Sequence, residues 1–313
     1  GLVAHEHFHL WNVKRLRPIV LGPFNYDTEN YTTNLWIAEG FTEYYQGIVV
    51  RRTNLYPPEN YLDVLVGEIN ILENLPGKNV QTVAESSFDA WIKAYRPNEN
   101  SNNTTISYYN KGAIIGMMLD LEIINNTQGV HSLDDVMKYM YTEYYKTKKR
   151  GYTDAEFKKA FEKFAGKKLD DFYKKYINGL TPVDYNKYLG YAGYKITDEL
   201  ADNNDPALGL TTLTNGNKKI IVTSVTRGTA AYIDGINVGD ELTAIDDNPI
   251  TDAATMLNGK KPGDKVNVTV MRDGLTITLP VTLLKNARVK YKIVPVDNAS
   301  PQQLLVGKKW LSL

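Results

Sequence analysis

Residues 5–9 read HEHFH, which places two histidines four positions apart with a glutamate directly after the first. On a helix, His5 and His9 project from the same face one turn apart, so their ring nitrogens can reach one Zn²⁺ ion at ~2.0–2.1 Å. Glu6 then lies beside the metal without binding it, and its carboxylate can accept a proton from metal-bound water. His7 leaves that face and is interpreted as a packing residue or an outer support of the ligands. The stretch predicts a helix that carries a catalytic zinc site.

A catalytic zinc site needs a third protein ligand and one open position. The chain has only four histidines, and the isolated His131 is best explained as a residue near the start of a helix. Carboxylates are therefore the better candidates for the third ligand. Residues 36–45, WIAEGFTEYY, predict a second helix on which Glu39 and Glu43 again stand four positions apart.

The composition describes an ordinary globular protein of 313 residues, 42% of them hydrophobic, and its length predicts two domains. The 36 Lys and Arg residues balance the 36 Asp and Glu residues, so charge gives no case for a nucleic acid or an anionic membrane as partner. The absence of cysteine excludes disulfides and thiolate metal sites. No apolar run approaches the ~20 residues of a membrane-spanning helix.

The patterning of apolar residues changes along the chain. Residues 1–197 show helical spacing, with capping residues at the predicted helix starts, and predict a mainly α-helical domain. A polar linker follows, and residues 206–286 alternate with a period of two, which predicts a small β-rich domain. Residues 287–313 are expected to form a C-terminal tail. The fold class is therefore multidomain, mainly α-helical and then β-rich.

The pairing of HEHFH with the later EGF segment resembles the gluzincin metallopeptidases. In that clan the glutamate before Gly-Phe is the third zinc ligand, which implies that Glu39 completes the set begun by His5 and His9. Glu43 falls where related enzymes place an acid that supports a zinc histidine. A solvated helix acid is the other interpretation of Glu43.

A narrower resemblance joins residues 5–18, HEHFHLWNVKRLRP, to the glycyl aminopeptidase family, the sixty-first metallopeptidase family. Matching segments continue through residues 88–97 and 107–113. The resemblance implies a bacterial aminopeptidase that releases small N-terminal residues such as Gly or Ala from a peptide, and it leaves cytoplasm and periplasm open. A Tyr-x-Lys-Gly motif further implies that Tyr109 donates a hydrogen bond to the oxyanion, with Tyr108 as its competitor for this role.

The β-rich part resembles a PDZ domain, which the same family carries at this place. The segments that support this are PALGL at 206–210, the strand at 220–225 and VGDEL at 238–242. PDZ domains add a peptide as an extra strand and hold its C-terminal carboxylate in a nest of backbone N–H groups. The resemblance implies that Leu208, Gly209 and Leu210 form the nest and that Thr211 begins the docking edge. The other interpretation is that this domain binds nothing.

Two further expectations concern the whole protein. In gluzincins a β-sheet precedes the HExxH helix and packs on it, whereas only four residues precede His5 here. We therefore expect the C-terminal part of a longer enzyme, whose N-terminal β domain is its missing partner, with weak zinc binding and slow turnover. The alternative function is a catalytically impaired, peptide-binding PDZ module on a peptidase scaffold. Retention of Glu6 favours the enzyme.

Overall fold

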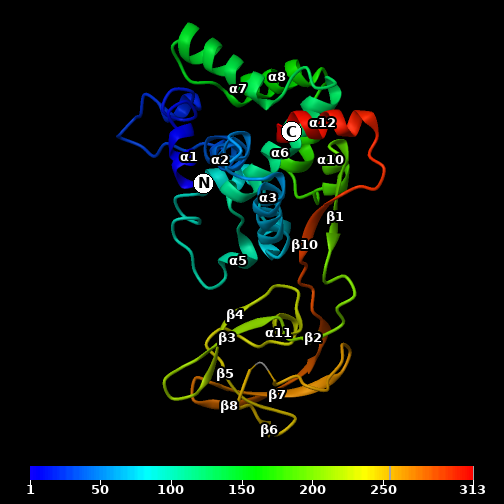
Figure 1. Cartoon of the computed structure of the whole chain (residues 1–313). Helices are drawn as coiled ribbons and strands as arrows, with labels where there is room; N and C mark the ends of the chain where they lie inside the picture. The colour runs from blue at the N-terminus through cyan, green and yellow to red at the C-terminus, as the bar shows by residue number, and fades with distance from the viewer. Residues whose placement is uncertain (254, 313) are drawn as a thin grey trace. The chain divides into compact units, whose positions relative to one another are not determined.

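The computed structural model describes residues 1–253 and 255–312, and the chain divides into two compact units (Figure 1). The first, called the helical unit, comprises Gly1–Arg96, Thr105–Glu199 and Lys290–Leu313. The second, called the β unit, comprises Pro97–Thr104 and Leu200–Val289. Helices dominate the first unit and strands the second, which confirms the fold class predicted from the sequence.

Helix α6 (Tyr108–Asn126) is the centre of the helical unit, and nearly all of its residues are buried. Apolar residues cover every face of this segment, which is the pattern of a helix surrounded by others. No helix in the described ranges combines the length and apolarity needed to cross a bilayer. The other helical elements of the unit are α1 (Leu2–Phe8), η1 (Ile19–Leu21), η2 (Trp36–Gly40), α2 (Phe41–Arg52), α3 (Pro58–Glu73), η3 (Pro76–Asn79), α4 (Val83–Phe88), α7 (Leu133–Met140), η4 (Tyr141–Thr147), α8 (Asp154–Ala165), α9 (Asp170–Phe172), η5 (Tyr173–Ile177), α10 (Tyr185–Tyr191) and α12 (Pro301–Leu311).

Helix ends lie where the sequence predicts them because side chains satisfy the free backbone groups. Thr153 and Glu156 form a reciprocal capping box that starts α8, and Gly166 ends the helix with a φ of 67°. The Ser107 hydroxyl accepts a hydrogen bond from the backbone N–H of Asn110 and caps the start of α6. These local rules account for the positions of the helices without reference to distant contacts.

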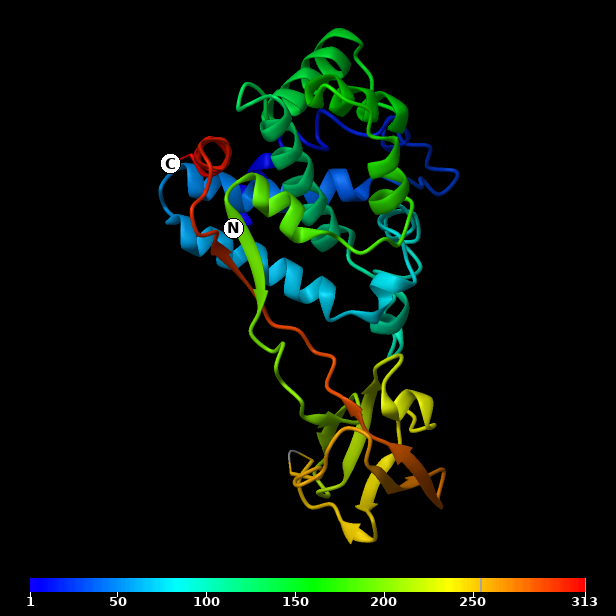
Figure 2. The ribbon, with the colours of Figure 1, turned by 90° about the vertical axis from the view of Figure 1, so that its right-hand side faces the viewer.

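Residues 287–313 were expected as a tail, but most of them form ordered parts of the helical unit. Strand β10 (Tyr291–Pro295) pairs antiparallel with β1 (Tyr194–Asp198), as Figure 2 shows. Helix α12 follows, and the side chain of Trp310 is fully buried against the helical core. Its indole N–H donates to the Tyr44 hydroxyl at 2.9 Å. The expectation of a tail is therefore wrong for most of this segment, whose apolar side chains pack on elements far away in the sequence.

The β unit is built on an antiparallel sheet with the strand order β3-β4-β5-β7-β8. Its core is aliphatic, and the alternation predicted for residues 266–270 places three valines inside it. The predicted hairpin turn at Asp273 and Gly274 joins β7 to β8, with positive φ at both residues. The elements of the unit are α5 (Ser101–Thr104), β2 (Pro206–Ala207), β3 (Leu210–Thr214), β4 (Ile220–Val225), α11 (Ala230–Ile233), β5 (Glu241–Ile245), β6 (Asn248–Pro249), β7 (Lys265–Arg272), β8 (Leu275–Thr282) and β9 (Leu284–Lys285).

The sequence does not predict that residues 97–104 belong to the β unit. The side chain of Asn103 is buried and donates to the Val225 carbonyl at 2.7 Å. Its oxygen accepts the backbone N–H of Arg227 at 2.8 Å. One asparagine therefore satisfies both backbone groups where β4 ends, which anchors this short segment on the β unit.

Candidate metal centre

The helical unit brings together the three side chains expected to bind zinc. The Nε2 atom of His9 lies 3.1 Å from Oε2 of Glu39, and the Nε2 atom of His5 lies 3.5 Å from the same oxygen. Ligand atoms of the three residues all lie within 4.8 Å of one another. Helix α1 supplies the first histidine and ends next to the second, and η2 supplies the glutamate.

The other nitrogen of each imidazole has its own partner. Nδ1 of His9 donates to the Asn12 carbonyl at 3.1 Å, and Nδ1 of His5 lies 3.3 Å from the Glu43 carboxylate. The Nε2 atoms of both rings face the Glu39 carboxylate, and the three residues form an arrangement that a cation would hold together. A tetrahedral Zn²⁺ site with bonds of ~2.0–2.1 Å separates its ligand atoms by about 3.4 Å, which is close to the two Nε2–Oε2 distances of 3.1 and 3.5 Å.

The electrostatics of the cluster keep the Glu39 carboxylate ionised. The hydrogen bond with Glu39 raises the pKa of His9 against the opposing effect of burial. Burial alone would raise the pKa of Glu39, but the hydrogen bond and charge of His9, together with His5, hold it below its usual value. Burial raises the pKa of Glu43, and the nearby Glu68 carboxylate adds to the effect. The carboxylate of Glu39 thus stays ionised, as a metal ligand must.

Asn12, which the sequence does not single out, positions the element that carries Glu39. Its side chain is fully buried, and its amide donates to the carbonyls of Ile37 and Ala38 at 2.9 and 3.0 Å. These carbonyls belong to η2, which is a π-helical turn rather than the regular helix predicted for residues 36–45. Such wide turns often occur at functional sites because they redirect one side chain. Helical periodicity in the sequence does not predict these two hydrogen bonds, which link the residues just after HEHFH to η2.

Two glycines allow α6 to approach η2 closely. A Cβ atom added to Gly112 would lie 2.6 Å from the Trp36 carbonyl oxygen and 2.8 Å from the Cα of Gly40. A side chain at either glycine would therefore force the two backbones apart. Both belong to motifs noted in the sequence, the Gly of Glu-Gly-Phe and the Gly of Tyr-x-Lys-Gly. Their contact explains how two motifs more than 60 residues apart form one site.

The remaining predicted catalytic side chains lie around this cluster. The ring of Tyr109 stacks beside His5 with 6.2 Å between ring centroids, and Tyr108 stacks on Tyr109 at 4.8 Å. The Tyr108 hydroxyl donates to the Tyr95 hydroxyl at 3.3 Å, so it already has a protein partner. Glu6 is exposed to solvent, on the turn of α1 between the two histidines. His7 is also exposed and packs edge-on against Trp11, which agrees with a packing role.

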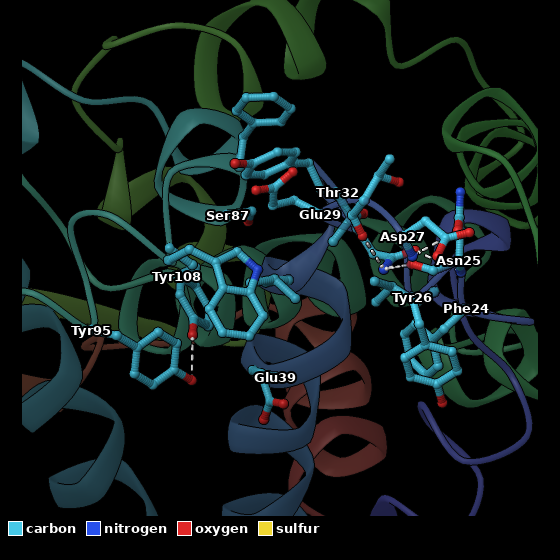
Figure 3. A pocket seen from close by; sticks show the side chains of 18 residues that line it. Phe24, Asn25, Tyr26, Asp27, Glu29, Thr32, Glu39, Ser87, Tyr95 and Tyr108 are labelled. Atoms are coloured by element: carbon cyan, nitrogen blue, oxygen red, sulfur yellow. Dashed lines mark hydrogen bonds between the residues drawn. The ribbon is translucent and has the colours of Figure 1, made fainter.

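A cleft of about 970 Å³ is lined by Glu39 but not by either histidine of the cluster (Figure 3). Its walls are formed by residues 24–32, by the end of α4 with the turns that follow it, and by Tyr108. The sequence does not predict this cleft, because much of its wall comes from irregular segments without apolar periodicity. The surplus of aromatic residues in these segments is the one signal that could have drawn attention to them.

The residues predicted to hold a peptide C-terminus lie in the β unit. Gly209 has a φ of 76°, and its carbonyl accepts the backbone N–H of Thr226 at 2.8 Å. The carbonyl of Leu208 accepts the N–H of Ala231 at 2.8 Å. Within residues 1–253 and 255–312, the N–H groups of Leu208 and Gly209 donate no hydrogen bond. Leu210 and Thr211 begin β3, the outermost strand of its sheet.

Comparison with known families agrees with both resemblances. Residues 1–115 match the family described as M61 glycyl aminopeptidase. Residues 206–283 match the PDZ domain. No curated protein matches the chain.

Solved structures extend the similarity to the whole chain. An aminopeptidase N family protein from Idiomarina loihiensis aligns with a TM-score of 0.85 and 29% identity, over 99% of this chain and 54% of that one. The chain thus spans about half the length of this relative. A serine endoprotease from Yersinia pestis is 25% identical over 27% of this chain and 30% of its own, with a TM-score of 0.24, too low to inform the fold.

Proposed function

We propose that this chain, whose residues 1–115 match the M61 glycyl aminopeptidase family and whose residues 206–283 match the PDZ domain, acts as a zinc-dependent peptidase. The observation that carries the proposal is the convergence of His5, His9 and Glu39 within 4.8 Å at the end of a cleft. The family supports an aminopeptidase that releases small N-terminal residues such as Gly or Ala.

His5, His9 and Glu39 would hold a single Zn²⁺ ion. Two imidazoles and one carboxylate are the donor set of many catalytic zinc sites, which keep a fourth position open. When bound, the metal supplies a Lewis acid that lowers the pKa of a coordinated water towards ~7. The Glu43 carboxylate faces Nδ1 of His5 and fixes the ring so that Nε2 points at the site.

Glu6 is the proposed general base. It lies on the exposed turn between the two histidines, where its carboxylate can meet a water molecule that approaches the site from solvent. The carboxylate takes a proton from the attacking water and returns it to the nitrogen of the departing amine. No other carboxylate in the described residues follows a histidine of the cluster directly in the chain.

Tyr109 is the proposed donor to the oxyanion. Burial raises the pKa of its phenol, and the nearby Glu39 carboxylate adds to this, so the hydroxyl keeps its proton at neutral pH. A neutral donor beside His5 can stabilise negative charge that develops on the carbonyl oxygen. Tyr108 is the weaker candidate because its side chain is buried, whereas that of Tyr109 is partly exposed.

The PDZ domain is proposed to hold the C-terminus of a peptide. Leu208, Gly209 and Leu210 would bind the carboxylate through backbone N–H groups, and Thr211 would start the edge to which the peptide adds as a strand. The free N–H groups of Leu208 and Gly209 support this role.

The decisive experiment measures zinc content and hydrolysis of alanyl and glycyl chromogenic amides on this chain and on Glu39→Ala. We expect weak zinc binding and slow hydrolysis in this chain, with zinc affinity in the variant reduced further by orders of magnitude, because one of three ligands is lost. Glu99→Ala, which removes an exposed acid from another part of the chain, is the matched control. Unchanged zinc affinity in Glu39→Ala would refute the ligand set. A zinc-free, inactive chain that still binds peptides would instead support the impaired binding module.

A further inference from the structure

The cleft that begins at Glu39 has an unusual charge balance. Its 18 lining residues include three carboxylates, those of Asp27, Glu29 and Glu39, and no lysine, arginine or histidine. Figure 3 shows Glu39 set apart from the other two, which lie on the 24–32 segment. Because Glu39 faces His5 and His9, Asp27 and Glu29 determine the charge of the outer part of the cleft.

Asp27 and Glu29 have no internal cation to neutralise them. Neither makes an ion pair with any residue in the described part of the chain, although the protein as a whole is electrically balanced. Both side chains are exposed to solvent. They present an uncompensated negative potential to whatever enters the cleft.

Aromatic rings form much of the remaining wall. Tyr31 and Phe88 stack with 4.9 Å between centroids, and Trp91 and Tyr95 lie 6.3 Å apart. Trp91 and Tyr95 are 64% and 62% exposed, which is a large apolar surface to leave in contact with water. Aromatic faces together with carboxylates form the kind of site that binds an organic cation with an aliphatic stem.

We propose that this cleft binds the side chain of a lysine or arginine that follows the peptide bond to be cut. The inference rests on the proposed peptidase function, in which the residue before that bond is small. A cleft of about 970 Å³ is far larger than Gly or Ala requires, so its outer part serves the residues beyond the bond. The substrate class is therefore a peptide with a small first residue and a basic residue after it.

Two separate interactions contribute to the binding of a basic side chain, one made by its aliphatic stem and one by its cationic head. The aliphatic stem of the basic side chain buries apolar surface against the rings, a gain that any unbranched side chain would share. The cationic head gains attraction to the rings and to Asp27 and Glu29, which a neutral side chain cannot gain. Norleucine has the stem of lysine without its ammonium group, so comparing the two residues measures what the charged head adds to binding.

The test compares two C-terminally amidated tetrapeptides, Ala-Lys-Ala-Ala and Ala-Nle-Ala-Ala, where Nle is norleucine. Amidation removes the carboxylate that the PDZ nest would bind. Affinity is measured by calorimetry on zinc-supplemented Glu6→Gln protein, and hydrolysis is measured on the unaltered chain. We expect the lysine peptide to bind about tenfold more tightly, because cation–π and Coulomb attraction add about 1.4 kcal/mol in a partly exposed site. Added salt should reduce this preference.

Two variants locate the effect. Asp27→Asn with Glu29→Gln should reduce the preference for lysine to the part that the rings supply, whereas the control Asp63→Asn with Glu59→Gln, exposed acids on α3, should retain the full preference. Trp91→Ala should weaken both peptides, and the lysine peptide more, because the ring contacts the stem of both side chains and the ammonium group of lysine alone. Equal affinity for the two peptides in the unaltered cleft, or a preference that Asp27→Asn with Glu29→Gln leaves undiminished, overturns the inference. Selective binding without hydrolysis refutes the peptidase function and leaves the cleft as a basic-peptide site.

Discussion

The two units differ in where they keep their polar groups. The helical unit buries many of them, including the charged side chains of Lys111, Asp120 and Glu122 on α6. In the described part of the β unit, Asn103 and Asp240 are the only buried polar residues, and the core is otherwise aliphatic. Buried polar groups cost stability unless they are paired, so the helical unit gives up stability for side-chain chemistry. In the β unit the proposed binding groups are backbone N–H groups next to an edge strand.

Among the changes expected to affect one unit and not the other, Glu6→Gln should have the largest effect, which is on hydrolysis. The amide has nearly the same shape but cannot accept a proton, so hydrolysis should fall by ~10²–10⁴ while zinc stays bound. Peptide binding by the PDZ domain should not change, since the variant alters one exposed side chain of the helical unit. Turnover, zinc content and peptide affinity are measured on the same preparation, with Glu59→Gln as control. Full activity in Glu6→Gln would exclude it as the base.

The next largest effect concerns the buried charge of the β unit. Arg272 binds the Asp240 carboxylate through two hydrogen bonds of 2.7 Å each, and the Asp240 side chain is 1% exposed. Arg272→Met leaves this carboxylate buried without a cation, although the backbone N–H of Asn237 still donates to it, so the free energy of unfolding should fall by about 3–5 kcal/mol. Hydrogen exchange measures where stability is lost: we expect backbone amides of β5 and β7 to exchange faster, and those of the helical unit to be unaffected.

A second substitution controls this measurement. Asp240→Leu combined with Arg272→Met removes both charges and should recover most of the stability, because the unpaired carboxylate causes the loss. If Arg272→Met destabilises the helical unit as much as the β unit, the two units do not respond independently and the comparison fails.

Lys111 tests the cost of buried polarity in the helical unit. Burial lowers its pKa from the usual 10.5 to about 8, and the Glu73 carboxylate offsets only part of this. Between pH 8 and 10.5 the unfolded chain binds a proton that the folded chain lacks, so the free energy of unfolding rises with pH across this window. Lys111→Met should lose that rise and be more stable at pH 7 by about 3 kcal/mol.

The measurement is denaturant unfolding at pH 7, 8, 9 and 10. Lys138→Met, which replaces an exposed lysine on α7, is the control and should keep the pH dependence. A Lys111→Met variant that is less stable at pH 7 would show that its ammonium group is compensated inside the core.

The contrast also explains what the sequence could predict. Helix α8, the β7–β8 hairpin and the HEHFH turn depend on local spacing, and each was predicted from a short stretch of sequence. Glu39 was identified through a family motif, because nothing local relates it to His5. The cleft depends on long-range packing, as does α12, whose Trp310 meets Tyr44 from the other end of the chain. Such contacts have no periodic signature.

The smallest effect is expected at the edge of the β unit, where binding depends on backbone groups. If Leu208 and Gly209 bind a peptide carboxylate, a peptide with a free C-terminus should bind about tenfold more tightly than its C-terminal amide, through one charge-assisted set of hydrogen bonds. No side-chain substitution removes a backbone N–H, so the ligand is varied instead of the protein. Gly209→Ala adds a second probe, because a Cβ at a φ of 76° strains the loop and would meet Thr229, and it should weaken the acid more than the amide. Calorimetry with Glu6→Gln protein avoids hydrolysis during the titration. Equal affinities for acid and amide would mean that this PDZ domain does not bind peptide C-termini through Leu208 and Gly209.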